Sequence, residues 1–272
     1  MSVTFPPPQH FFRDLRYTMV VEGEREIGSL PIQPAMRRAD GALPVGALVT
    51  LVDMVAGRTG MRAAPPQYPI TSDIDLRVLA TGDFESLSVT ADLLRCGSRS
   101  VVLSSDVYGE GGEQRVRVAF ALANFALFPP VDEYPMGDIA KKEDSIHFPD
   151  DTSALRAPLA EQLGLRTVDA ATGVLEVDVV PYVMNPLAVL QGGVHAVLAE
   201  AAGETFVRSQ RGGTPRVSGL SIRYLASGRT GPVRTTTRPL RTTDATTLLD
   251  IELRDLGQDD RVITAALIEV AH

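Results

Sequence analysis

The sequence contains a single cysteine, Cys96, and no long apolar stretch. One cysteine cannot form a disulfide within its own chain, so nothing indicates a secreted fold held together by disulfides. Residues 1–17 lack the basic segment followed by an apolar segment that defines a signal peptide. A membrane-spanning helix needs about 18 or more apolar residues in succession, and no such run occurs. These absences predict a soluble, cytoplasmic protein.

Positive charge is also scarce. Lys and Arg number 26 against 34 Asp and Glu, which gives a net charge of -8 and a pI of 5.1. Such a chain has no general electrostatic attraction to nucleic acids or to anionic membranes. We therefore expect neither nucleic acid nor membrane as a partner.

Sequence signatures of several catalytic and cofactor-binding sites are missing as well. The four histidines show no metal-ligand spacing, so no metal site is predicted. No G-x-S-x-G motif occurs, which excludes an α/β-hydrolase. The glycine-rich stretch YGEGGEQ, residues 108–114, joins two predicted strands, so it indicates a hairpin turn and not a phosphate-binding loop. No cofactor is expected.

What the sequence does contain is an internal repeat. Pro69–Gly82, PITSDIDLRVLATG, matches Pro215–Gly228, PRVSGLSIRYLASG, at an offset of 146 positions (215 − 69). Upstream, GALVTLVDMVAG matches GVHAVLAEAAG. An offset of 147 there aligns Asp53 with Glu200, whereas an offset of 146 aligns the glycines that end the two segments. The chain is thus predicted to be a tandem duplication.

Both halves have the same predicted order of elements: a strand, a long helix, and a four-strand antiparallel meander with glycine-rich turns. The helices are predicted over about 44–63 and about 191–210. A proline-rich, charged segment without apolar periodicity separates the halves. We therefore predict an α+β protein with an N-terminal domain over 1–130, a linker over 131–150 and a C-terminal domain over 151–272.

The second helix carries residues that suit the chemistry of a carbonyl group. Gln191, Gly192 and Gly193 open it, and Glu200 lies on its apolar body. Unpaired N–H groups at a helix start carry partial positive charge, and glycine allows a carbonyl to approach them closely. Donors in this position stabilise an oxyanion, and a nearby carboxylate can activate water or attack the carbonyl itself.

This pattern resembles the phenylacetic-acid-pathway type of acyl-CoA thioesterase, which has the hotdog fold. In that family an Asn is followed six residues later by His-Gly-Gly, and an acid lies seven residues after the second Gly. Asn185, Gln191, Gly192, Gly193 and Glu200 occupy these places, with Gln replacing His and Glu replacing Asp. The resemblance implies two fused hotdog domains, each a long central helix wrapped by a curved antiparallel sheet. It also implies a thioester hydrolase that acts on acyl-CoA.

The first half retains less of the pattern. Gly46 and Asp53 match the second Gly and the acid, but Pro44 and Val45 precede the glycine. Gly193 and Glu200 lie roughly 10 Å apart along one helix, which is too far for both to act on one carbonyl. The resembling family pairs two hotdogs, so that one helix start faces the acid of the other helix.

Two composite sites are therefore expected. Site one combines Asp53 with Asn185, Gln191, Gly192 and Gly193, and site two combines Glu200 with Pro44, Val45 and Gly46. In site one we expect Asp53 to be the catalytic carboxylate, the Gly193 N–H to polarise the carbonyl, and Asn185 to orient the nucleophile. Site two lacks a donor at its proline, so we expect it to be degenerate.

Arg208 and Arg211, after the second helix, are candidates for binding the phosphates of coenzyme A. Further copies of the chain are the expected protein partner, in a homo-oligomer. The sequence leaves the acyl chain open, as well as the choice between coenzyme A and acyl carrier protein.

Two other functions remain open. A non-catalytic acyl-CoA-binding or scaffold protein would explain why Gln191 replaces His and why the first-half motif is eroded. An enoyl-CoA hydratase is suggested by the NPL that begins at Asn185, which is similar to part of the hydratase motif GDxNPxH. Tyr182 and Val183 stand where that motif has Gly and Asp.

Overall fold

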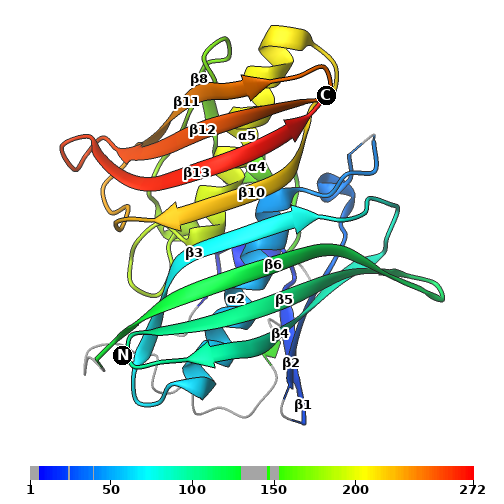
Figure 1. Ribbon diagram of the computed structural model, residues 1–272, viewed down its shortest axis with the longest axis vertical. Helices are drawn as coiled ribbons and strands as arrows, with labels where there is room; N and C mark the ends of the chain where they lie inside the picture. The colour runs from blue at the N-terminus through cyan, green and yellow to red at the C-terminus, as the bar shows by residue number, and fades with distance from the viewer. Residues whose placement is uncertain (1–5, 24, 39, 130–145, 148–152) are drawn as a thin grey trace.

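The computed structural model describes residues 6–23, 25–38, 40–129, 146–147 and 153–272. Its strands form one antiparallel sheet in the order β7-β1-β2-β4-β5-β6-β3-β10-β13-β12-β11-β9-β8 (Figure 1). Strands β1 to β6 come from the first half of the chain and β8 to β13 from the second. The two halves therefore share one continuous sheet.

The strands of the first half are β1 (Thr18–Glu22), β2 (Arg25–Pro31), β3 (Tyr68–Val78), β4 (Ser86–Cys96), β5 (Ser100–Gly111) and β6 (Gln114–Phe128). Those that follow are β7 (Ile146–His147), β8 (Arg166–Asp169), β9 (Val174–Val177), β10 (Arg216–Tyr224), β11 (Val233–Thr242), β12 (Thr246–Asp255) and β13 (Arg261–Ala271). The helices are α1 (Phe11–Asp14), α2 (Val45–Ala63), α4 (Leu159–Gln162) and α5 (Gly192–Arg211), with short 3-10 turns η1 (Pro34–Met36) and η2 (Pro181–Val183).

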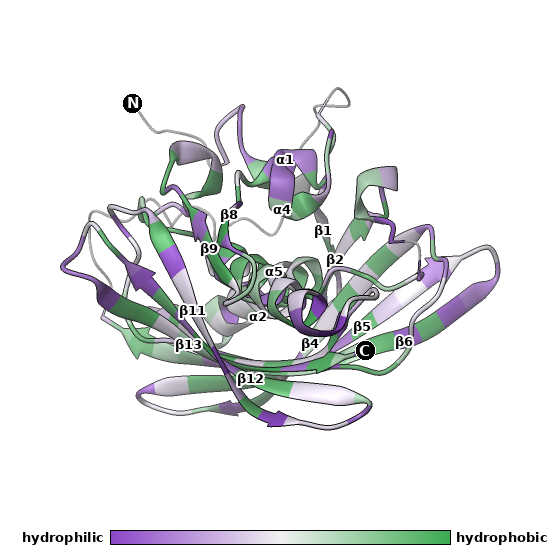
Figure 2. Ribbon diagram, turned by 90° about the horizontal axis from the view of Figure 1, so that it is seen from above, coloured by the Kyte–Doolittle hydropathy of each residue, from purple (hydrophilic) through white to green (hydrophobic). Residues whose placement is uncertain are grey.

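The two long helices lie inside the curve of the sheet. Seen from above, the sheet forms a trough around α2 and α5, and the short helices α1 and α4 lie over its open side (Figure 2). Most residues of α2 and α5 are buried, because the sheet covers the helices and they also pack on each other. This is the arrangement expected for helices that are apolar on most of their surface. The predicted α+β fold and both predicted long helices are confirmed.

Glycines bring α2 and α5 into close contact. A Cβ atom added to Gly46 would lie 2.4 to 2.7 Å from side-chain and backbone atoms of Val197. A Cβ atom added to Gly193 would lie 1.9 Å from the Thr50 Oγ1. The two contacts are equivalent at an offset of 147 positions (193 − 46 and 197 − 50). The structure therefore aligns the helices with the offset that places Asp53 on Glu200.

The predicted four-strand meander is wrong in its first connection. β3 pairs with β6 and not with β4, and β10 pairs with β13 and not with β11. The connection from β3 to β4, residues 79–85, is longer than the two to five residues that usually close a hairpin. The free edges of β3 and β10 pair with each other instead. The single strand predicted before α2 is also a hairpin, β1–β2.

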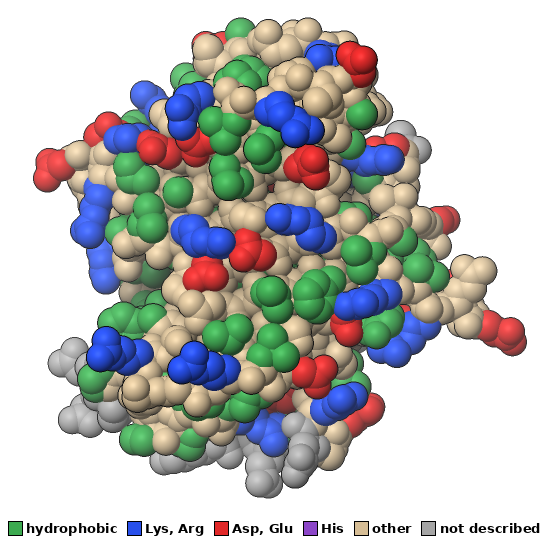
Figure 3. Space-filling view, in the orientation of Figure 1, with side chains coloured by type: hydrophobic (Ala, Val, Ile, Leu, Met, Phe, Trp, Pro, Cys, Tyr) green, Lys and Arg blue, Asp and Glu red, His purple; other side chains and the backbone are tan. Residues whose placement is uncertain are grey.

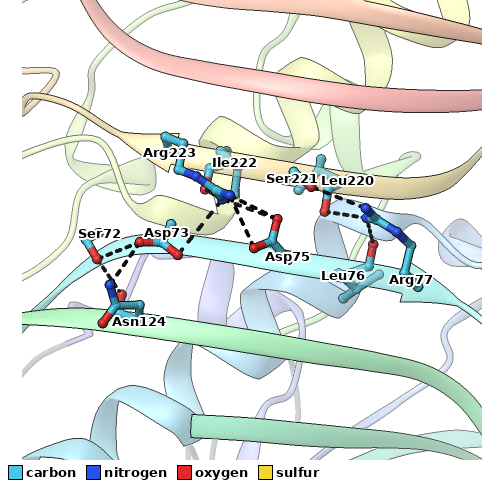
Figure 4. A network of polar contacts seen from close by, with 10 residues as sticks. All are labelled: Ser72, Asp73, Asp75, Leu76, Arg77, Asn124, Leu220, Ser221, Ile222 and Arg223. Atoms are coloured by element: carbon cyan, nitrogen blue, oxygen red, sulfur yellow. Dashed lines mark hydrogen bonds and ion pairs between the residues drawn. The ribbon is translucent and has the colours of Figure 1, made fainter. Parts of the chain in front are cut away.

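The pairing of β3 with β10 forms the seam between the halves. Five residue pairs join the strands, from Arg77 with Gly219 to Asp73 with Arg223. On the outer face Arg223 forms an ion pair with Asp75 at 3.3 Å, whereas Arg77 donates a hydrogen bond to the Leu220 carbonyl (Figure 4). Positive, negative and apolar side chains are mixed over this face (Figure 3).

Most of the predicted linker, 131–150, lies outside the described residues. Ile146–His147 form β7, which pairs with β1. The proposed domain limits at 130 and 151 stay predictions, although β6 ends at Phe128 before this segment. None of the helices in the described part of the chain combines the length and the apolarity needed to cross a membrane.

Candidate active site

Site one lies where the start of α5 meets the middle of α2. The Gln191 Nε2 donates a hydrogen bond to the Asp53 Oδ2 at 3.2 Å, although the two residues are 138 positions apart. The other carboxylate oxygen, Oδ1, accepts a hydrogen bond from the Thr71 Oγ1 on β3 at 2.7 Å. Of the residues predicted for site one, Asp53, Gln191 and Gly192 are thus brought together.

Gln191 is oriented by the helix that it begins. Its Oε1 accepts a hydrogen bond from the Gly193 N–H at 2.6 Å and so caps the N-terminus of α5. A backbone N–H can only donate, so the amide oxygen must face it and the amide nitrogen must face Asp53. The capping interaction therefore aims an N–H donor at the carboxylate.

The Asp53 carboxyl has an altered proton affinity. Burial between the helices raises its pKa to about 6, while the hydrogen bonds from Thr71 and Gln191 oppose the rise because they favour the charged form. A carboxyl with this pKa is mostly ionised at neutral pH, and it is a stronger base than an ordinary aspartate. The residue as a whole is half-buried. It has the properties of a general base.

Gly192 lets the helix start approach Asp53 closely. A Cβ atom on Gly192 would lie 3.0 Å from the Asp53 Oδ2 and 3.4 Å from the ring of Tyr224. Within the described part of the chain, the Gly192 N–H has no hydrogen-bond acceptor. It is one of the unpaired donors of a helix N-terminus, and the glycine that carries it lies next to Asp53.

The predicted role of Gly193 is therefore corrected. Its N–H was expected to polarise a substrate carbonyl, but it is already bonded to Gln191. Its lack of a side chain serves the helix crossing, where Thr50 occupies the adjacent space. The donor available for a carbonyl is the N–H of Gly192, one residue earlier.

Asn185 has a local partner. Its Oδ1 accepts hydrogen bonds from the backbone N–H groups of Leu187 at 2.9 Å and Val189 at 3.4 Å. These contacts shape the loop that leads into α5, as expected of a turn residue before proline. The structure places no contact between Asn185 and Asp53, so a role in orienting the nucleophile stays a prediction.

Site two has the same crossed arrangement with different chemistry. Glu200 accepts hydrogen bonds from the N–H of Val45 at 2.7 Å and from the N–H of Gly46 at 2.8 Å, one to each carboxylate oxygen. Glu200 is 6% exposed. Burial and the neighbouring Glu204 raise the pKa of Glu200, while the two N–H groups oppose the rise because they favour the charged form. The donors that a substrate carbonyl would need are filled by the protein's own carboxylate.

The polar residues of site one have no counterparts in site two. The repeat aligns Gln191 with Pro44, Gly192 with Val45, and Thr71 with Val217. Next to Glu200, Arg38 forms an ion pair with Glu204 at 2.6 Å and donates a hydrogen bond to the Pro215 carbonyl at 2.9 Å. Gly46, which we expected to contact substrate, packs against Val197. Site two is a closed contact between the halves.

Arg208 and Arg211 lie far from site one. They are exposed near the C-terminal end of α5, roughly 25 to 30 Å along the helix from Gln191. Arg211 lines a hollow of about 250 Å³ together with Phe206 and Pro239. This hollow is smaller than most ligand pockets, which measure about 300–1,000 Å³. The structure does not bring either arginine to the residues of site one.

Sequence reasoning missed two residues of this region, Thr71 and Tyr224. Thr71 lies on β3 and Tyr224 lies on the repeated strand β10. The other copy has valine at each equivalent position, Val217 for Thr71 and Val78 for Tyr224. A hydroxyl that replaces an apolar residue in only one copy was the available signal.

His195, one turn into α5, is buried and contacts the Thr264 Oγ1 through its Nδ1 at 2.6 Å. Burial lowers the pKa of His195 to about 4, so its ring is neutral at neutral pH.

No group of three or more His, Cys, Asp and Glu side chains that could hold a metal ion occurs among the residues that the structure describes. The side chains and backbone of site one offer a carboxylate, a carboxamide, hydroxyls and the start of a helix.

Comparison with known proteins finds a family model that matches part of the chain. Residues 183–270 match the family model of the acyl-CoA thioesterase N-terminal domain. No curated protein sequence matches the chain.

Solved structures match over nearly the whole length. A provisional thioesterase from Novosphingobium aromaticivorans DSM 12444 superposes with a TM-score of 0.65 at 13% identity, covering 93% of this chain and 97% of that one. A provisional thioesterase II from Thermobifida fusca YX gives a TM-score of 0.64 at 14% identity, covering 97% and 98%. A hotdog-fold protein of unknown function from Alicyclobacillus acidocaldarius gives 0.59 at 12% identity, covering 96% and 97%. These likenesses confirm the predicted hotdog fold.

Proposed function

We propose that this hotdog-fold chain is a thioester hydrolase that hydrolyses acyl-CoA at site one. The match of residues 183–270 to the family model of the acyl-CoA thioesterase N-terminal domain supports this proposal. The observation that carries the proposal is the contact between the Gln191 Nε2 and the Asp53 Oδ2, beside the unpaired N–H of Gly192. This contact supports the proposal, because it brings a carboxylate to a helix start that has an unpaired N–H donor.

The carbonyl oxygen of the thioester accepts a hydrogen bond from the Gly192 N–H. The partial positive charge of the α5 N-terminus adds to this polarisation, because the helix axis points at the carbonyl. When the carbonyl carbon becomes tetrahedral, the same donor stabilises the negative oxygen. Losing one such donor typically reduces the rate about 10²- to 10³-fold.

Asp53 activates the water. The Thr71 hydroxyl holds the Oδ1, which leaves the Oδ2 beside Gln191 to accept a proton. As the water oxygen bonds to the carbonyl carbon, one of its protons passes to Asp53. The carbon–sulfur bond then breaks, the thiolate takes the proton from Asp53, and a carboxylic acid and the free thiol leave while the carboxylate is regenerated. Asp53 thus acts as general base without a covalent intermediate.

The experiment is to measure thiol release from a panel of short, long and aromatic acyl-CoA thioesters, with wild type and Asp53→Asn. The substitution keeps the size of the side chain but removes the base, so we expect a loss of about 10²- to 10⁴-fold in kcat. Asp73→Asn is the matched control, because Asp73 lies on the outer face of β3 and bonds to Ser72 and Asn124 (Figure 4).

Two results would contradict the proposal. Full activity in Asp53→Asn would remove Asp53 from the mechanism. Binding of acyl-CoA by wild type without any thiol release would instead favour the non-catalytic binding protein, and loss of the conjugated absorbance of an enoyl-CoA would favour a hydratase.

A further inference from the structure

Tyr224, at the end of β10, contacts Gly192 of site one and lies within electrostatic reach of Asp53. Its hydroxyl donates a hydrogen bond to the Gly192 carbonyl at 3.0 Å. A Cβ atom added to Gly192 would lie 3.4 Å from the ring of Tyr224. The ring therefore lies on the side of Gly192 that also faces Asp53. Burial, together with the negative charge of Asp53, raises the pKa of Tyr224 well above its ordinary value, so the hydroxyl remains protonated and can donate.

The Gly192 carbonyl and the Gly193 N–H belong to the same planar peptide group. Tyr224 holds the carbonyl end of that group, and the Gln191 Oε1 holds the N–H end. The other end of the Gln191 carboxamide reaches Asp53. A continuous series of hydrogen bonds thus runs from Tyr224 through one peptide group and one carboxamide to the carboxylate.

The ring of Tyr224 is fixed in its turn by a buried histidine. His195 packs edge-on against it with ring centroids 5.5 Å apart, and the His195 Nδ1 contacts the Thr264 Oγ1 at 2.6 Å. A neutral His195 adds no charge to the site. The tyrosine is therefore held by packing on one side and by its hydrogen bond on the other.

We propose that Tyr224 is a positioning residue for thioester hydrolysis, which fixes the first peptide group of α5 so that Gln191 meets Asp53 and the Gly192 N–H stays available. The proposal rests on the function proposed above. It is supported by the repeat, because site two has Val78 at the equivalent position and also lacks the carboxamide.

Tyr224→Phe keeps the ring and its contact with His195 while removing the hydroxyl. Without the hydroxyl the first peptide group can rotate, and the donation from Gln191 to Asp53 weakens. Since that donation favours the charged carboxylate, the pKa of Asp53 should rise by about 0.5 to 1. We expect kcat to fall about tenfold with KM changed less than twofold, because losing a hydrogen bond of ordinary strength from the transition state has an effect of this size.

Two measurements decide the matter. Steady-state kinetics across pH give kcat, KM and the acidic limb of the profile, and carbon-13 NMR titration gives the pKa of Asp53, assigned by its absence in Asp53→Asn. Tyr182→Phe is the matched control, because its hydroxyl donates to Asp14 at 2.6 Å and does not contact site one. It should leave kcat and the titration of Asp53 as in wild type.

The proposal is overturned if Tyr224→Phe is merely less stable, with kcat and the pKa of Asp53 unchanged. If wild type hydrolyses no thioester, the proposed function fails, but the titration still decides whether Tyr224 controls the contact between Gln191 and Asp53. An unchanged titration then overturns the positioning role as well, and a raised pKa of Asp53 supports it.

Discussion

At the scale of single residues, two equivalent acids have acquired different environments. Asp53 is half-buried and accepts side-chain donors, Gln191 and Thr71. Glu200 is buried and accepts two backbone donors at the start of α2. A carboxylate whose two oxygens both bind backbone N–H groups caps a helix, whereas one beside an unpaired N–H can act on a ligand. These environments support the chemical task proposed for Asp53, and they make Glu200 a cap of α2.

The same pKa that suits Asp53 for catalysis should cost the protein stability at neutral pH. Its folded pKa of about 6 lies above the ordinary 3.8, so the folded state binds this proton more tightly than the unfolded state does. This proton contributes its full share to the stability of the folded state below about pH 4. That contribution is lost as pH rises through 6. The two pKa values differ by about two, which corresponds to a loss of at most about 3 kcal/mol in the free energy of unfolding.

Asp53→Asn should therefore be more stable than wild type at pH 7, with a smaller difference near pH 4. Asparagine can accept from Gln191 and donate to the Thr71 oxygen, so the contacts are retained. Urea unfolding at both pH values measures the two differences. A loss of stability in Asp53→Asn that is equal at both pH values would contradict this prediction.

At the scale of elements, the crossing of α2 and α5 fixes site one. The helices run in opposite directions, since the start of each contacts the body of the other. Their close approach depends on Gly46 and Gly193, which have no side chain at the two contact points. Glycines that resemble a substrate-binding motif in the sequence thus set the distance between Asp53 and the helix start that faces it.

Gly193→Ala should destabilise the protein by about 1–3 kcal/mol, because the added methyl group would overlap the Thr50 side chain. Adding Thr50→Gly removes the obstructing atoms and should restore part of the loss. Gly57→Ala, also within a long helix, is the control, because its nearest neighbouring atom would lie 3.4 Å away. It should retain or gain stability, since alanine favours helix.

A double-mutant cycle from urea unfolding measures the coupling between positions 193 and 50. Additive effects of Gly193→Ala and Thr50→Gly would show that the methyl group is accommodated elsewhere. The close crossing would then not be the reason for the glycine.

At the scale of the whole molecule, duplication produced a symmetric frame with asymmetric sites. The halves join through the β3–β10 seam and the α2–α5 crossing, so each site is built from both halves. Leu122 and Leu267, on the strands next to the seam, are 41% and 46% exposed. An association of copies through the sheet, as predicted from the sequence, would cover them.

One ligand should bind per chain. Because Glu200 fills the donors of site two, only site one can accept a thioester carbonyl. Isothermal titration of wild type with a non-hydrolysable thioether analogue of acyl-CoA should give a stoichiometry of one per chain. Two sites of similar affinity would contradict the closure of site two, and Glu200→Ala then shows which of the two is affected.

The sequence alone determined the repeat, both long helices, the hotdog fold and the residues that begin α5. The hotdog fold was implied by the resemblance of the Asn185–Glu200 motif to a known family. The other features follow from local patterns, because apolar periodicity reports which faces are buried and glycine marks where a helix begins or a chain turns. The equivalence of Asp53 and Glu200 in the repeat also came from the sequence, through the offset of 147.

Only the tertiary structure decided which hydrogen bonds form. Periodicity does not report partners that lie more than a hundred positions apart, such as Gln191 with Asp53 or Val45 with Glu200. The order of the strands was misjudged for the same reason, since edge pairing depends on where the halves meet. The capping of the Gly193 N–H and the approach of Tyr224 follow from packing at ångström distances, which the identity of a residue does not encode.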